Sequence, residues 1–88
     1  MKKPNNQTAE VLYELIRKSA ITRMSIMTQT GILNLTARIA DLRIRHGINV
    51  VCDKVLTKNK HGRPISYGKW RLFDKRSARL LYNKINKE

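Results

Sequence analysis

Apolar residues first recur at helical spacing just after a polar beginning. The three- and four-residue intervals of one helix face predict a helix over residues 8–18. Thr8 is the expected N-cap, because its hydroxyl can accept a hydrogen bond from an amide of the first turn. Residues 1–7 are polar and basic, and we expect them to form a flexible arm. The apolar face of this helix consists of Val11, Leu12, Leu15 and Ile16.

A brief strand and a second helix are expected next. Ser19–Thr22 is too short for a helix and is interpreted as a strand. A helix over residues 24–30 follows and ends at Gly31, because glycine accepts the left-handed conformation that closes a helix. The apolar positions of this helix are Met24, Met27 and Ile26.

A longer helix is predicted over residues 34–46. Asn34 is the expected N-cap, and Gly47 marks the end. One stripe of the helix recurs at offsets typical of a buried face. That stripe consists of Leu35, Ile39, Leu42 and His46, while Thr36, Ala37, Ala40, Asp41 and Ile44 point elsewhere.

Beyond Gly47 the period changes from helical to extended. Residues 48–52 are rich in β-branched side chains and predict a strand, in which Cys52 is expected to be a small buried residue. Residues 57–64 are polar, basic and punctuated by Gly and Pro, as loops are. Over residues 65–73 the side chains alternate between two faces, as in a strand, and Trp70 is expected in the core. The simplest arrangement is an antiparallel hairpin with a flexible basic tip.

Asp74 can cap a last helix over residues 75–85, in which Ala78, Leu81, Tyr82 and Ile85 share a face. The order of elements predicts an α+β, mainly α fold. We interpret it as a winged helix-turn-helix with a three-helix core, a β-hairpin wing and an extra C-terminal helix. The domain is expected to span residues 8–88 as a single unit.

Charge narrows the class of partner. Nineteen Lys and Arg oppose six Asp and Glu among 88 residues, for a net charge of +13. Such a field attracts polyanions and repels a second copy of the chain. Nucleic acid, an anionic membrane and an acidic protein would all suit it, and nucleic acid is the usual partner of a compact basic domain. No apolar run approaches the ~18 residues of a membrane span, and no export signal is visible, so we expect a cytoplasmic, nucleoid-associated protein.

Catalytic chemistry has little basis in this chain. The single cysteine excludes an internal disulfide, and His46, Cys52 and His61 lack metal-site spacing. Paired carboxylates, a Ser-His-Asp arrangement and a glycine-rich phosphate loop are not visible. We therefore expect no enzyme activity, no cofactor, no metal and no small-molecule substrate.

The helix-turn-helix unit, residues 23–47, holds the first candidates for DNA contact. The outer face of its second helix is small and polar near the N-terminus, where base contacts are usually made. Arg38 is the long donor there and could reach a guanine edge or a phosphate, or could instead pair with Asp41 on a solvated face. The candidates in this unit are Arg23, Ser25, Asn34, Thr36, Ala37, Arg38, Ala40 and Arg45.

The basic hairpin supplies the second set of candidates. Phosphate binding needs charged, mobile groups that follow a nucleic-acid backbone, and the tip offers several. Alternatively, such lysines only solubilise an exposed strand edge. The candidates are Lys58, Lys60, His61, Arg63 and Lys69. Tyr67 could be a stacking platform for single strands.

Several runs also resemble one family. Leu35-Thr36-Ala37-Arg38-Ile39-Ala40-Asp41-Leu42-Arg43, preceded by Ile21-Thr22-Arg23 and Gly31-Ile32 and followed by His46-Gly47-Ile48, resembles the small winged helix-turn-helix proteins of phages and prophages. Tyr67-Gly68-Lys69-Trp70-Arg71-Leu72 looks like the last strand of that family. The resemblance covers residues 8–73 and implies DNA binding by Thr36, Ala37 and Arg38. The helix after Asp74 lies outside it.

The sequence thus favours a double-stranded DNA-binding protein, a transcription regulator or recombination accessory factor of phage or bacterial origin. Residues 34–46 would enter the major groove, and residues 57–66 would lie on the backbone. Two alternatives stay open: an RNA-binding or ribosome-associated module, and a protein-interaction module that forms a homodimer through helix 75–85.

Overall fold

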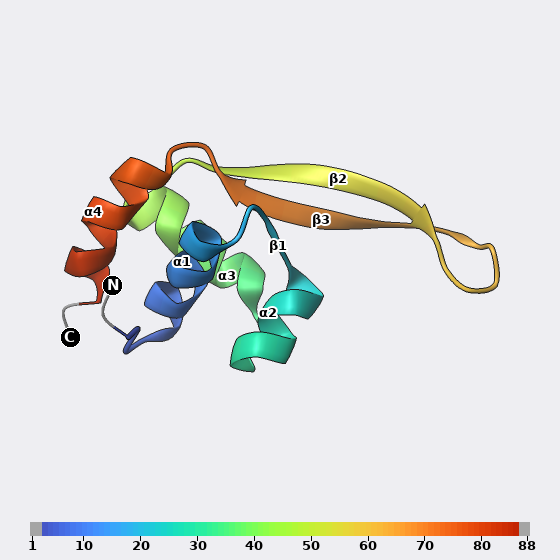
Figure 1. Cartoon of the computed structure of the whole chain (residues 1–88), viewed down its shortest axis with the longest axis horizontal. Helices are drawn as coiled ribbons and strands as arrows, with labels where there is room; N and C mark the ends of the chain where they lie inside the picture. Colours follow the sequence, from blue (N-terminus) through green and yellow to red (C-terminus); the bar gives the residue numbers. More distant parts are fainter. Residues whose placement is uncertain (1–2, 87–88) are drawn as a thin grey trace.

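The structure is a computed structural model that describes residues 3–86. Helices and a small antiparallel sheet pack together, and a long hairpin projects from them (Figure 1). The hairpin accounts for most of the long dimension, since the molecule measures 46 × 24 × 20 Å. The elements are α1 (Gln7–Arg17), β1 (Ile21–Thr22), α2 (Arg23–Thr30), α3 (Leu35–Ala40), η1 (Asp41–Arg45, a π-helical turn), β2 (Val50–Lys58), β3 (Pro64–Leu72) and α4 (Lys75–Ile85).

This combination confirms the predicted α+β class. The sheet order is β1-β3-β2, so β3 is central and β2 is an edge strand. The expected brief strand, the hairpin and the last helix are all present, and α4 has the predicted bounds. None of the helices between residues 3 and 86 is long and apolar enough to cross a membrane.

The first helix begins earlier than predicted. Asn6, not Thr8, is the N-cap, and its Oδ1 accepts from the amide of Ala9 at 2.8 Å. The same side chain donates to the carbonyl of Ile85 at 3.0 Å, while the Asn5 amide donates to Asn86 at 2.6 Å. The expected flexible arm is therefore tied to the end of α4 over residues 5–6, and residues 1–2 of it lie outside the described part of the chain.

Local signals define the ends of α2 and α3. Thr22 and Ser25 form a reciprocal capping box at the start of α2, and Gly31 closes that helix with φ 77°. Asn34 caps α3 as predicted. Of the three apolar positions expected in α2, Ile26 is buried, whereas Met24 is 67% and Met27 is 40% exposed. Met24 and Met27 line an open groove between α2 and β3 instead.

The hairpin is longer than predicted. Nine residues of each strand pair, from Val50 opposite Leu72 to Lys58 opposite Pro64. The expected loop over residues 57–64 shrinks to residues 59–63. Cys52, expected to be buried, is exposed, because the ribbon leaves the core soon after Val50. Trp70, opposite Cys52, is half-buried and packs against the core cluster rather than inside it.

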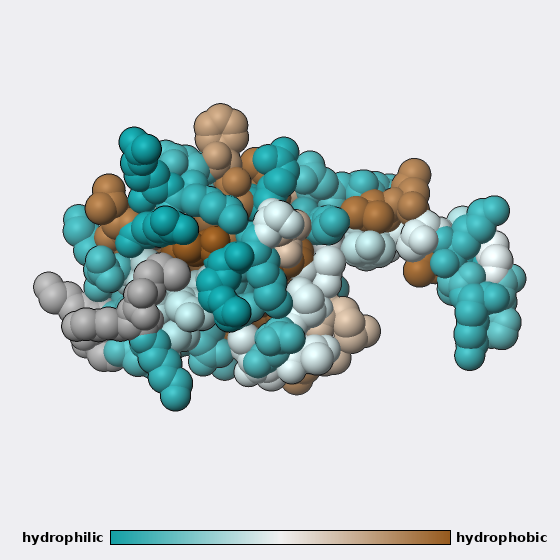
Figure 2. Space-filling view, in the orientation of Figure 1, coloured by the Kyte–Doolittle hydropathy of each residue, from teal (hydrophilic) through white to brown (hydrophobic). Residues whose placement is uncertain are grey.

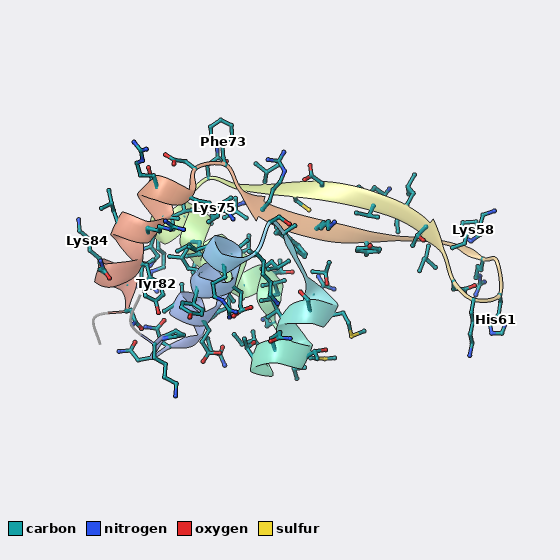
Figure 3. The ribbon with its side chains drawn as sticks, in the orientation of Figure 1. Lys58, His61, Phe73, Lys75, Tyr82 and Lys84 are labelled. Atoms are coloured by element: carbon teal, nitrogen blue, oxygen red, sulfur yellow. The ribbon has the colours of Figure 1, made fainter. Side chains whose placement is uncertain are left out.

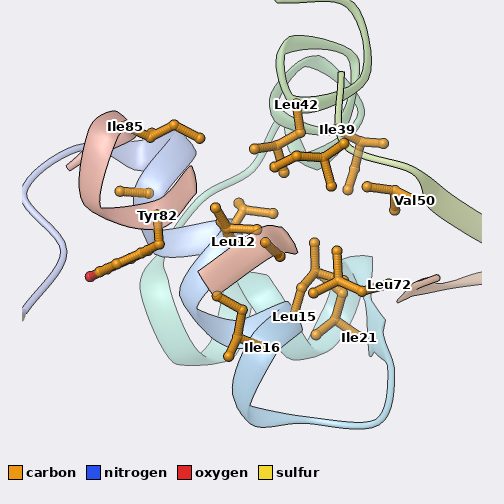
Figure 4. Packing of buried hydrophobic residues seen from close by; sticks show 14 of the residues in the cluster. Leu12, Leu15, Ile16, Ile21, Ile39, Leu42, Val50, Leu72, Tyr82 and Ile85 are labelled. Carbon is orange, nitrogen blue, oxygen red and sulfur yellow. The ribbon is translucent and has the colours of Figure 1, made fainter. Parts of the chain in front are cut away.

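One hydrophobic cluster joins the helices to the base of the sheet. Leu12 of α1 lies between the buried residues of α3–η1 and those of α4, and Leu15 lies beside Ile21 and Leu72 at the base of the sheet (Figure 4). The predicted stripe of the third helix is confirmed at Leu35, Ile39 and Leu42, whereas His46 is only half-buried. Tyr82 is fully buried, so α4 belongs to the core of the domain.

Candidate nucleic-acid interface

The predicted DNA-contacting residues fall into two regions of the structure. One is the α2–α3–η1 unit, and the other is the far part of the β2–β3 hairpin, where Lys58 and His61 stand well away from the helices (Figure 3). The sheet connects the two regions, because β1 runs directly into α2 and pairs with β3.

A side-chain hydrogen bond connects the start of α2 to the first turn of α3. Arg23 Nη2 donates to Thr36 Oγ1 at 3.1 Å, and both side chains are exposed. Arg23 keeps further N–H groups for a ligand, since a guanidinium has five. Ser25 has a different task, because its hydroxyl donates to the Thr22 carbonyl and accepts from the Thr22 amide. We therefore leave Ser25 out of the interface.

The Arg38 side chain lies on the flank of α3, between the buried face and the outer face of the helix. Its Nη2 lies 3.5 Å from Asp41 Oδ2, and the two side chains are 30% and 27% exposed. Thr8 of α1 donates to the same carboxylate oxygen at 3.4 Å. These contacts place Arg38 in a bracing position between α3 and η1, on the flank that approaches α1.

Another arginine of this helix is also engaged. Arg43 Nε and Nη2 donate to the carbonyl of Val50 at 3.1 and 2.6 Å, which holds the start of β2 against η1. This contact was not predictable from the sequence, because the bond joins elements that only the fold brings together. Arg45, the last residue of η1, is exposed.

The outer surface of α3–η1 carries short or alkyl side chains. Thr36 is exposed, Ala37 and Ala40 are partly exposed, and Ile44 is 82% exposed. Ile44 lies outside the buried stripe, as predicted, and the sequence suggested no function for it. Its exposure on an otherwise well-packed helix is the signal that separates it from core isoleucines.

An asparagine holds the basic tip of the hairpin in a defined turn. Asn59 Oδ1 accepts from the amides of His61 and Arg63 at 2.9 and 3.0 Å, and the Asn59 amide donates to the Arg63 carbonyl. Gly62 adopts φ 81°, which favours glycine. The tip backbone is thus ordered, although its side chains extend into solvent.

The hairpin presents its cations largely without counter-ions. An ion pair joins Arg71 Nε to Asp53 at 2.8 Å, near the base. Within residues 3–86, the exposed Lys58, Lys60, Arg63 and Lys69 form no salt bridge with an acidic side chain. Figure 2 shows hydrophilic residues gathered at the far end of the molecule, with hydrophobic ones midway along the ribbon.

A third surface lies on α4 and borders residues 46–49, which directly follow η1. Phe73 and Leu80 are each 72% exposed beside a shallow cavity of about 440 Å³ between α4 and residues 46–49. At the start of this helix, hydrogen bonds from the Ser77 side chain and backbone hold the pKa of Asp74 below its ordinary value of 3.8. Burial raises the pKa of Tyr82, with the neighbouring Tyr13 as a second cause.

Comparison of the chain with protein-family models, with curated proteins and with solved structures finds no match. Residues 3–86 do not bring three His, Cys, Asp or Glu side chains together in a metal-binding arrangement.

Proposed function

We propose that this protein binds double-stranded DNA as a winged helix, with α3–η1 in the major groove and the β2–β3 hairpin as the wing. The observation that carries the proposal is the combination of an exposed helix face with a projecting hairpin whose distal cations are unpaired within the described residues. A net charge of +13 supports a polyanionic ligand. The order of elements, helix-strand-helix-helix-hairpin, supports the winged-helix interpretation.

The helix is suited to a groove because short side chains cover its outer surface near the start of α3. The major groove is about 12 Å wide and admits one α-helix. Ala37 and Ala40 let the helix backbone approach the base edges closely, and Thr36 and Arg23 supply polar contacts at the start of the helix. Arg45 at the other end is placed for a phosphate.

The wing is suited to the DNA backbone because it is long and basic. A nine-residue strand spans roughly 30 Å at the usual rise per residue. Lys58, Lys60, His61 and Arg63 at its tip could therefore contact phosphates well beyond the helix footprint. Lys69 would make its contact nearer the base of the wing.

The biological role that follows from this proposal is transcription regulation or an accessory part in recombination, in the bacterial cytoplasm or in phage-infected cells. The resemblance of residues 8–73 to small phage and prophage proteins supports this assignment. The function needs no enzyme activity and no cofactor.

The test is a parallel titration of labelled duplex DNA, single-stranded DNA of the same sequence and structured RNA, each at several salt concentrations. Salt-dependent binding with preference for the duplex is the expected result. Preference for structured RNA at every salt concentration would replace the proposal with an RNA-binding role. Selection from random duplexes then gives the preferred site.

A second candidate role, self-association through α4, is favoured by the exposure of Phe73 and Leu80 beside the cavity. A dimer should protect two half-sites about one helical turn apart, roughly 34 Å, whereas a monomer should protect one. Sedimentation with and without the selected duplex distinguishes the two states. A monomer in both conditions would exclude this role.

A further inference from the structure

The outer face of α3–η1 is made of alkyl groups at positions that align along one side. Ala37, Ala40 and Ile44 follow each other at spacings of three and four residues, and Thr36 adds a methyl group beside them. Ile44 is the most prominent, with 82% of its surface exposed. Ile44 is the penultimate residue of η1, so the alkyl face extends from the first turn of α3 to the end of the helical unit.

The long donors of the same helix each hold a contact within the protein, which restrains how far they can turn toward a base edge. Arg38 is paired with Asp41, and Arg43 donates twice to the Val50 carbonyl. Recognition of guanine in the major groove depends on an arginine or lysine that reaches O6 and N7 together. Between residues 35 and 44 the helix offers no such side chain free of another contact.

Resting on the proposed function, we propose that this alkyl face recognises thymine in duplex DNA through its C5-methyl group. That methyl is the apolar group that a base pair presents in the major groove, and short alkyl side chains contact it directly. The substrate class is therefore a thymine-containing duplex site of a few base pairs, read chiefly by Ala37, Ala40 and Ile44.

Charge favours DNA over a second copy of the chain as the occupant of this face. Arg23 and Arg45 lie exposed near the two ends of the face, and the whole chain carries +13. A second copy would bring the same cations together, whereas a duplex brings phosphates on both sides of its groove.

The test removes the methyl group and nothing else. In the selected duplex, each thymine is replaced singly by deoxyuridine, and affinity is measured at one salt concentration. Removal of one buried methyl group corresponds to roughly fourfold weaker binding. We expect this weakening at two or three thymines, with the salt dependence unchanged.

Two variants assign the effect to the helix face. Ile44→Ala should abolish the thymine-to-uracil difference at one of those positions. Leu80→Ala removes a similar alkyl group from α4, where the side chain is 72% exposed, and should leave every thymine-to-uracil ratio unchanged.

Several results would overturn the proposal. Equal binding of the thymine and uracil duplexes would do so, as would selection that enriches no sequence. Sites sensitive to 7-deazaguanine but not to uracil would show guanine readout instead. Self-association abolished by Ile44→Ala would identify a second copy as the occupant. Loss of all duplex binding would overturn the proposed function as well, whereas salt-dependent binding without a uracil effect overturns only this inference.

Discussion

The guanidinium of Arg38 lies 3.5 Å from the carboxylate of Asp41, one turn further along the same continuous helix. The hydroxyl of Thr8 on α1 reaches the same carboxylate oxygen. Arg38 therefore joins α3 to η1 and, through Asp41, to the first helix. The contact gives Arg38 a structural role, and the guanine contact that the sequence also allows stays a prediction.

Replacing Arg38 with alanine should lower stability and leave base preference intact. Removing a partly buried ion pair of this kind costs roughly 1 kcal/mol. Thermal melting and selected-site profiles of parent and variant measure the two effects. Arg45→Ala is the matched control, because Arg45 is exposed and its replacement should weaken binding without changing the melt. A relaxed profile at one base position with an unchanged melt would restore Arg38 as a base reader.

The wing should contribute to binding of every duplex. Replacing Lys58, Lys60 and Arg63 together with alanine removes three exposed cations from the tip. We expect weaker binding to all sequences by similar factors, because phosphate contacts carry no sequence information. Stability should change little, since these side chains make no ion pairs within the described residues.

A second triple variant separates position from net charge. Arg76, Arg79 and Lys84 are exposed on α4, and their replacement removes the same charge from another face. Affinity should fall less than in the wing variant. Equal decreases in the two variants would mean that only the overall field matters and that the wing makes no specific contact.

Salt dependence measures how many phosphates the protein neutralises. If helix and wing together make about five phosphate contacts, the slope of log affinity against log salt should be roughly −4 to −5. The wing variant should reduce the steepness by about one for each phosphate that it no longer neutralises. A nearly flat salt dependence of the parent protein would show that the basic surface is only solvated.

Features determined by a few neighbouring residues were predictable from the sequence. The Asn34 and Asp74 caps, the left-handed Gly31 and the bounds of α4 depend on side chains within one turn. The Arg38–Asp41 contact follows in the same way from its three-residue spacing. The spacing alone does not show whether Arg38 contacts DNA or stays paired with Asp41.

Features determined by distant contacts were missed. Thr8 and Asn6 are both competent caps, and the hydrogen bond of Asn6 to Ile85 accompanies the choice of the earlier one. A β-branched run such as the one before Cys52 occurs both in buried strands and in projecting ribbons. The burial of Cys52 was therefore wrongly predicted. The eight residues of α2 are too few to show which face is inward.

Acid should weaken the start of α4 through Asp74. Its folded pKa is depressed below 3.8, so its contribution to stability is complete above that pH and is lost as the pH falls through the folded value. Asp74→Asn keeps a capping side chain that does not titrate. Melting temperatures from neutral pH to well below 3.8 should therefore fall less in this variant than in the parent. Parallel curves would show that the Ser77 contacts do not stabilise the ionised form.

Truncation of Tyr82 tests whether α4 is part of the domain core. The Tyr82 side chain is fully buried, and its ring centroid lies 5.9 Å from that of Tyr13 on α1. Tyr82→Ala should cost about 3–5 kcal/mol in the free energy of unfolding, as removal of a large buried aromatic ring does. Leu80→Ala, on the exposed side of the same helix, should stay within about 0.5 kcal/mol of the parent. Urea denaturation of the three proteins measures both values. If the two variants unfold at the same urea concentration, α4 is an appended helix and the core is complete without it.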